Sequence, residues 1–193
     1  MDLRLWILAE IDQMRFSYRI TAGAVPKNQW ALRPREDANS VSFLVWHMAR
    51  WHDLAVNVFV RDMEPVFAQG WHDRLRIGPE PGTGFTTEQV DVLSRDVDPS
   101  ELGAYFNAVL DHTHSWISGI TNDELAHVLD APVDTDVAWS KCPALLPPAA
   151  SWVPDFQRGW NGATFLRWTA LGHLHWHFGE LLTVTTALGH PVG

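Results

Sequence analysis

The positions of its prolines limit where this chain can form helices more than any other feature of its sequence does. Proline lacks a backbone donor and interrupts an α-helix, and most of the twelve prolines fall in three stretches, 26–34, 65–81 and 132–154. The longer segments that remain carry apolar residues at helical spacing. We expect helices at residues 2–23, 41–63, 100–120 and 163–188. With no convincing strand, the sequence predicts an all-α four-helix bundle with long inter-helix loops.

Capping residues indicate where further helical turns begin. Ser40 precedes the segment 41–63 and can accept hydrogen bonds from its first turn. Thr87 can cap a short helix of its own. Thr121 with Glu124 matches the capping-box pattern before another short turn.

Two stretches contain too many helix breakers for a regular element. Residues 64–86 hold three prolines and four glycines, and we interpret them as a surface excursion that could form a lid. Residues 130–162 hold five prolines, although their tryptophans indicate that the stretch packs against the body.

Length, composition and charge limit the kind of protein. A chain of 193 residues with 46% hydrophobic content can bury one sizeable core, so we expect a single domain over residues 1–193. The formal net charge of -9 argues against nucleic acid and anionic membranes as partners, because both attract basic surfaces. The composition therefore predicts that neither is a partner.

The cellular compartment is also an expectation from sequence. Cys142 is the single cysteine, so no disulfide can form within the chain. Glu10 and Asp12 interrupt the apolar N-terminal run that a signal peptide would need, and no later run approaches membrane-spanning length. We therefore expect a cytoplasmic protein.

The segment GHLHWHFGELL, residues 172–182, holds the most informative polar residues. On a helix His173 and His177 stack on one face, in the middle of an apolar stripe, while His175 points away. Two buried imidazoles need partners, and one metal ion would satisfy both, since the i, i+4 spacing suits helical metal sites. The alternative is a pair of core histidines bonded to carbonyl or carboxylate groups.

The residues alone leave the third ligand open. His47 and His52 lie on the second expected helix, and the helical angle places His52 nearer the centre of its apolar face. His112 and His114 on the third helix are further candidates, each more typical of a solvated or capping histidine. We assign no role to the remaining histidines, which are His72, His127 and His190.

Other residues near the pair could contribute. Glu180, three residues after His177, could orient a ligand imidazole, accept a proton, or remain a surface carboxylate. Several of the eleven tryptophans could wall an apolar pocket, pack in the core, or cover a subunit interface. Those nearest the histidines in sequence are Trp46, Trp51, Trp168 and Trp176.

Three segments resemble the DinB/YfiT-like superfamily. SVSFLVWHMARWHDL is similar to its second helix, SELGAYFNAVLDHTHSWISGITNDEL to its third helix and following turn, and HLHWHFGELL to its closing pattern of two histidines, glycine and an acidic or amide residue. The likeness covers most of the chain outside the two long loops. It implies a four-helix bundle of the DinB-like type in which His47, His173 and His177 form a three-histidine metal site.

The resemblance also implies a range of functions. Members similar to this chain include thiol S-transferases that use mycothiol or bacillithiol, metal-dependent hydrolases, and homodimers. For a three-histidine site we expect a divalent ion, zinc or nickel first, with iron or manganese as further candidates. The hypothesis is a metal-dependent transferase or hydrolase acting on a small molecule, and the alternative is a non-catalytic metal- or ligand-binding stress-response protein.

Overall fold

The computed structural model describes residues 2–142 and 145–192 of the chain, which form helices joined by turns and loops. In these residues the only β-type pairing is an isolated bridge between Pro132 and Asn161. The expected all-α fold is confirmed. The α-helices are α1 (Leu3–Ile20), α2 (Val41–Asp53), α3 (Trp71–Leu75), α4 (Thr87–Asp96), α5 (Pro99–Gly119), α6 (Asn122–Asp130), α7 (Thr135–Ser140), α8 (Val153–Gln157), α9 (Gly162–Thr164) and α10 (His173–Ala187).

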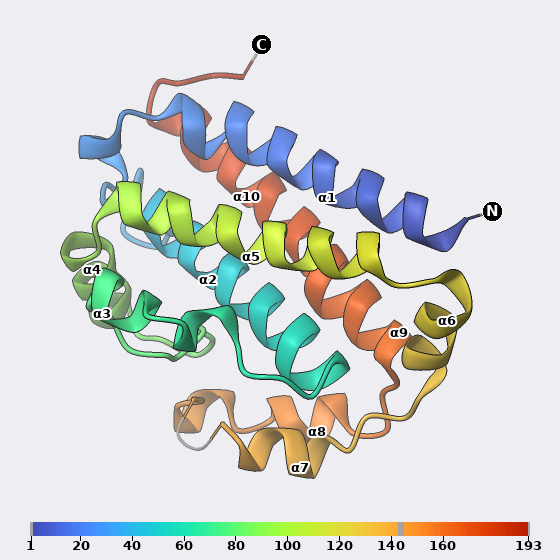
Figure 1. The fold of residues 1–193 in the computed structure, drawn as a ribbon. Coiled ribbons are helices and arrows are strands. Elements are labelled where there is room, and N and C mark those ends of the chain that lie inside the picture. The colour runs from blue at the N-terminus through green and yellow to red at the C-terminus, as the bar shows by residue number, and fades with distance from the viewer. Residues whose placement is uncertain (1, 143–144, 193) are drawn as a thin grey trace.

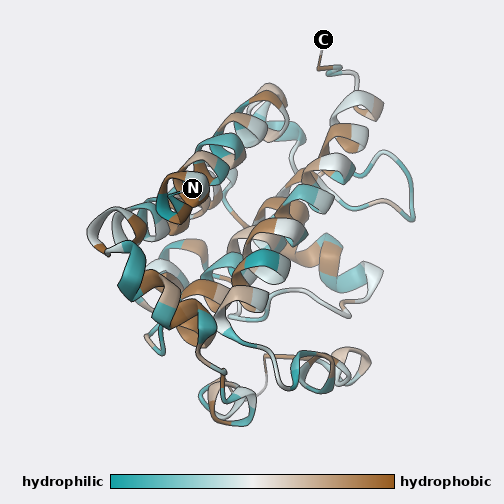
Figure 2. Ribbon diagram, turned by 90° about the vertical axis from the view of Figure 1, so that its right-hand side faces the viewer, coloured by the Kyte–Doolittle hydropathy of each residue, from teal (hydrophilic) through white to brown (hydrophobic). Residues whose placement is uncertain are grey.

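The long helices α1, α2, α5 and α10 lie side by side and form the bundle (Figure 1). Helix α2 contacts both α5 and α10, and α1 contacts α5 and α10. Apolar segments run along the long helices and alternate with polar ones (Figure 2), the pattern of helices that bury one face. None of the helices in the described part of the chain has the length and apolarity that a membrane crossing requires.

Two of the long helices contain π-helical turns. Helix α2 continues into a π-helical segment, Leu54–Val60, and a second π-helical segment, Phe165–Gly172, joins α9 to α10. The expected helices at 41–63 and 163–188 are therefore present, but neither is regular throughout. A Cβ at Gly172 would lie 2.9 Å from the carbonyl oxygen of Arg167, so this glycine permits the wide turn directly before His173.

The centre of the bundle is α2, in which all thirteen residues are buried. Its polar side chains Arg50 and Asp53 are at most 1% exposed, so they must be satisfied internally. Asp53 accepts hydrogen bonds from Arg50 at 3.1 Å, from Tyr105 at 2.7 Å and from the backbone amides of Val66 and Phe67. This network fixes the start of the following loop against the bundle.

The capping residues are as expected in two of three cases. Ser40 accepts a hydrogen bond from the first turn of α2, and Thr121 forms a capping box with Glu124 before α6. Thr87 is wrong as the cap of α4, because Thr86 occupies that position. The reason is the capping box itself, which requires the glutamine at position 89 to lie three residues after the cap.

The expected loops contain short helices. Residues 64–86 include a 3-10 turn, Val66–Ala68, and the helix α3. Residues 130–162, described apart from 143 and 144, contain α7 and α8, which pack together at one end of the bundle (Figure 1). The expectation that this second stretch lacks regular elements is therefore wrong.

Candidate metal centre

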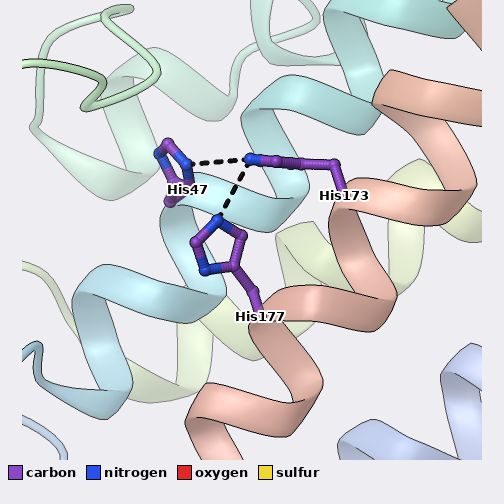
Figure 3. Close-up of side chains that lie close together, drawn as sticks. All are labelled: His47, His173 and His177. Carbon is purple, nitrogen blue, oxygen red and sulfur yellow. Dashed lines mark hydrogen bonds between the residues drawn. The ribbon is translucent and has the colours of Figure 1, made fainter.

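Three histidines from two helices meet inside the bundle (Figure 3). His47 lies on α2, and His173 and His177 lie one turn apart on α10. The Nε2 atom of His173 is 3.2 Å from Nε2 of His47 and 3.1 Å from Nε2 of His177. The spacing of the pair on α10 and the packing of α2 against it thus bring three ring nitrogens to one point.

These distances fit a shared cation. Histidine nitrogens bind Zn²⁺ at about 2.0–2.1 Å, so two nitrogens on one tetrahedral ion lie about 3.3 Å apart. The observed separations of 3.1 and 3.2 Å are close to that value. The group therefore has the composition and spacing of a site that could hold a divalent metal ion.

The hydrogen bonds of Nδ1 determine which nitrogen of His47 and of His177 carries the free lone pair. Nδ1 of His47 donates to the carbonyl of Pro81 at 2.6 Å, and Nδ1 of His177 donates to Glu180 Oε2 at 2.8 Å. Both residues are thereby held in the tautomer whose Nε2 is an unprotonated acceptor. Two lone pairs then face Nε2 of His173, whose own Nδ1 is buried without a partner among the described residues. Such a cluster of nitrogens is suited to receive a cation.

Burial keeps His47 and His173 neutral. Desolvation, with a smaller contribution from His177, lowers the pKa of His47 to about 3. Desolvation and the neighbouring histidines likewise lower the pKa of His173 to about 2. Neutral imidazole is the form that binds a metal, so at neutral pH neither ring has a proton to lose before a cation binds.

Glu180 contacts the group only through His177. Its Oε2 accepts from His177, and its Oε1 accepts from Asn39 Nδ2 at 2.7 Å. Burial tends to raise the pKa of Glu180, but the hydrogen bonds from His177 and Asn39 outweigh this effect and lower it. Of the three roles open from sequence, the geometry favours a carboxylate that orients a ligand imidazole.

His52, the rival of His47 on α2, lies elsewhere. Its Nδ1 donates to the carbonyl of Ala170 at 3.0 Å, and its Nε2 is 2.9 Å from the hydroxyl of Thr113. It is fully buried with both ring nitrogens satisfied. His52 is therefore a core histidine and does not belong to the group.

The remaining histidines also lie outside the group. His112 contacts Asn57, His114 contacts Ser118, His175 pairs with Glu10, His72 with Asp73, and His190 with Gln29; His127 is exposed. His175 points away from its two neighbours on α10, as expected from the helical angle.

The three histidines line a cavity of about 370 Å³. Its walls come from α2, from the loop around residues 82–85, from α8 and from the π-helical segment before α10. Trp51 and Trp168 line it as expected. Trp46 is instead buried and donates to the carbonyl of Glu80, and Trp176 is 66% exposed outside this cavity.

The loop before α4 is tied to the same face of α2. Besides His47, three side chains of α2 donate to it: Arg50 to the carbonyl of Pro79, Trp46 to that of Glu80, and Trp51 to the hydroxyl of Thr83. We expected that residues 64–86 could form a lid. Residues 79–83 of this loop are instead fixed to α2 and form a wall of the cavity. Sequence reasoning missed this role, and the signal available was the run PEPGTG.

A glycine allows this close approach. Gly82 has a φ of +89°, and a Cβ there would lie 2.8 Å from the Phe43 ring and 3.5 Å from His47 Nδ1. Glycine satisfies both the left-handed backbone and the lack of space.

A helical bundle in which three histidines line a cavity is compatible with a metal-binding protein. The sequence pattern of the DinB superfamily matches residues 10–146, and the chain belongs to that superfamily. A crystal structure titled as a conserved protein from Enterococcus faecalis is similar in fold, with a TM-score of 0.70 at 18% identity over 98% of this chain and 99% of that one. No curated protein matches the chain.

Proposed function

We propose that this protein is a metal-dependent enzyme that acts on a small molecule in the cavity of about 370 Å³ beside His47, His173 and His177. Superfamily membership and the three-histidine group are compatible with a metal-binding protein. The observation that carries the proposal is that Nε2 of His173 lies 3.1–3.2 Å from Nε2 of both His177 and His47, and that all three residues line the cavity. A structural metal site is normally closed, whereas these three histidines line a cavity that a ligand could enter.

The protein residues would hold and orient the ion. The three histidines would bind it through Nε2, while Pro81 and Glu180 keep two of the rings in the required tautomer. The ion would supply Lewis-acid chemistry that lowers the pKa of a thiol or a water molecule. The aromatic walls would exclude bulk water around the reacting groups.

Thiol transfer is the reaction that these surroundings support best. Among the described residues no carboxylate lines the cavity, and Glu180 is already engaged by His177 and Asn39. No side chain is therefore placed to take a proton from an attacking water. A low-molecular-weight thiol is far more acidic than water and needs no such base. We therefore propose a thiol S-transferase and keep hydrolysis as the second outcome of the test.

Metal content of purified variants tests the site. Zinc or nickel should bind at one ion per chain, and His47→Ala or His173→Ala should lower the metal content to near zero. His175→Ala is the matched control, because it lies on the same helix between the two histidines but is 42% exposed and pairs with Glu10. Unchanged metal content in both site variants would rule out the proposed ligands.

Turnover tests the reaction. The metal-loaded protein is mixed with monochlorobimane and with mycothiol, bacillithiol or cysteine. In the expected reaction a sulfur–carbon bond forms, the carbon–chlorine bond breaks, chloride leaves, and the thiol proton passes to solvent. We expect a rate that depends on the metal and is lost in His173→Ala. A metal-loaded protein without thiol transfer but with ester or amide hydrolysis would favour the hydrolase, and neither activity would favour the non-catalytic alternative.

A further inference from the structure

The cavity beside the histidines has walls made largely of aromatic rings. They come from α2, the loop before α4, α8 and the π-helical segment, and are Phe43, Trp51, Phe85, Trp152, Phe156 and Trp168. Phe43 and Trp51 are buried, whereas Trp152 and Phe156 are 56% and 48% exposed. The inner rings thus form the floor, and the exposed rings stand at the entrance. Surfaces of this kind bind flat apolar or aromatic groups.

The described lining of the cavity carries no charged side chain. Among the described residues, no lysine, arginine, aspartate or glutamate lines it. The carboxylate of Glu180 lies just behind His177, and the whole chain carries a net charge of -9. An anionic ligand would lose its hydration here without gaining a cationic side chain. The protein groups therefore select against carboxylates and phosphates.

One polar side chain of the lining has a donor group without a partner among the described residues. Gln157, at the end of α8, is only 3% exposed, and its Oε1 accepts from Trp139 Nε1 at 3.1 Å. Tryptophan can only donate, so this contact fixes which end of the amide is oxygen. The Nε2 group makes no hydrogen bond within the described residues, and Gln157 lines the cavity. In the described part of the chain this donor therefore has no acceptor.

Thr169 adds a second such group. It lies in the π-helical segment, is 5% exposed and lines the same cavity, and its hydroxyl has no partner in the described part of the chain. A ligand in this cavity could use the free hydrogen-bonding capacity of both residues. Both side chains therefore have capacity for a ligand that accepts hydrogen bonds.

We propose that the substrate is an uncharged aromatic molecule with a carbonyl-type acceptor, which stacks between the rings and accepts a hydrogen bond from Gln157. Thr169 supplies the second polar contact, and the described lining offers the corresponding acids no cationic side chain. The inference rests on the proposed function in treating this occupant as the electrophilic substrate. Gln157 acts here as a specificity-determining residue.

Binding of a matched pair of ligands tests the inference. The pair is 2-naphthamide and 2-naphthoate, which share size and shape and differ in charge, and affinity is measured by titration calorimetry. Metal-free protein is used first, because a bound cation would itself attract the carboxylate. We expect the amide to bind at least about tenfold tighter than the acid, since the acid gains no charged partner. Equal or tighter binding of 2-naphthoate would overturn the inference.

Substitutions test the donor. Gln157→Glu keeps an acceptor for Trp139 but removes the donor and adds a negative charge, so the affinity for 2-naphthamide should fall by about tenfold. Gln13→Glu, on the exposed side of α1, adds the same charge elsewhere and should change nothing. If Gln157→Glu fails to fold, Thr169→Val, which removes only a hydroxyl, takes its place and should weaken binding severalfold. Unchanged affinity in the folded variant would overturn the role of the donors.

The two proposals can fail separately. A preference for the amide in metal-free protein, together with no turnover by the metal-loaded protein, would overturn the proposed reaction and leave the ligand class standing. Normal thiol transfer without any preference between the two ligands would overturn the ligand class alone.

Discussion

At the scale of single residues, Glu180 shows how a group outside the cavity can control the site. Its carboxylate holds Nδ1 of His177 and is itself held by Asn39. The amide of a glutamine at this position is a weaker acceptor for His177, and it brings an N–H donor into the same contacts. In the proposed site this residue would therefore position a metal ligand without lining the cavity.

We expect Glu180→Gln to weaken zinc binding by about 10- to 100-fold, the usual effect of removing a partner that orients a metal ligand. Competition with a chromogenic chelator measures this affinity. Glu10→Gln is the control, because Glu10 pairs with His175 at 2.9 Å in a similar contact that does not reach the site. A loss of the same size in both variants would show that general charge, not the contact with His177, is responsible.

The site residues were predictable to different degrees. His173 and His177 could be found from their spacing on an apolar stripe, because the helical period relates sequence to position directly. The helical period could not predict the choice of His47 over His52, because both residues occupy buried positions on α2. Only the packing of α10 against α2 determines which of them meets the pair. That choice came from the resemblance to a known family. Gln157 lies in a stretch without periodicity and carried no signal.

At the scale of elements, the wall formed by residues 79–83 depends on Gly82. Alanine at Gly82 combines a strained left-handed backbone with a clash against Phe43, directly beside the carbonyl that holds His47. We expect Gly82→Ala to destabilise the fold by more than about 1–2 kcal/mol, the usual cost of a positive φ, and to weaken zinc binding. Urea unfolding and zinc titration measure the two effects.

Gly70→Ala provides the matched control. Gly70 also has a positive φ, +84°, but a Cβ there meets nothing within 4 Å. This variant should show the backbone cost alone and retain its affinity for zinc. If both variants behaved alike, the contact of the loop with His47 would have no special importance.

The elements themselves show where sequence reasoning succeeds. Long helices with repeated apolar spacing were found, because many residues support each of them. Helix α8 was missed because Pro154 was interpreted as a breaker, whereas it lies in the first turn, where proline is tolerated. The π-helical segments were missed because a local change of period leaves no mark that a pattern of 3.6 residues can detect.

At the scale of the whole molecule, folding buries three neutral imidazoles. Burial lowers the pKa of His47 to about 3, of His52 to about 4 and of His173 to about 2. In the unfolded chain these side chains titrate near 6.5. Below that pH the unfolded chain takes up protons that the folded chain does not, so acid favours unfolding.

We therefore expect the metal-free protein to lose stability as the pH falls from about 6.5 to 5, with a slope that approaches about 4 kcal/mol per pH unit, because each such proton contributes about 1.4 kcal/mol. Urea unfolding at pH 7, 6 and 5 measures this slope. A zinc-loaded sample should begin to lose stability at lower pH, since the cation competes with protons for two of the rings. A stability independent of pH in this window would contradict the burial of neutral histidines.

The position of Trp51 has a practical consequence. Its indole ring lies 6.3 Å from the ring of His173, centre to centre, with its N–H fixed on Thr83. Trp51 is therefore an intrinsic fluorophore next to any ion that the histidines bind. Open-shell ions such as copper quench the fluorescence of a neighbouring tryptophan, and closed-shell zinc does not. The fluorescence of Trp51 can therefore distinguish which ion is bound.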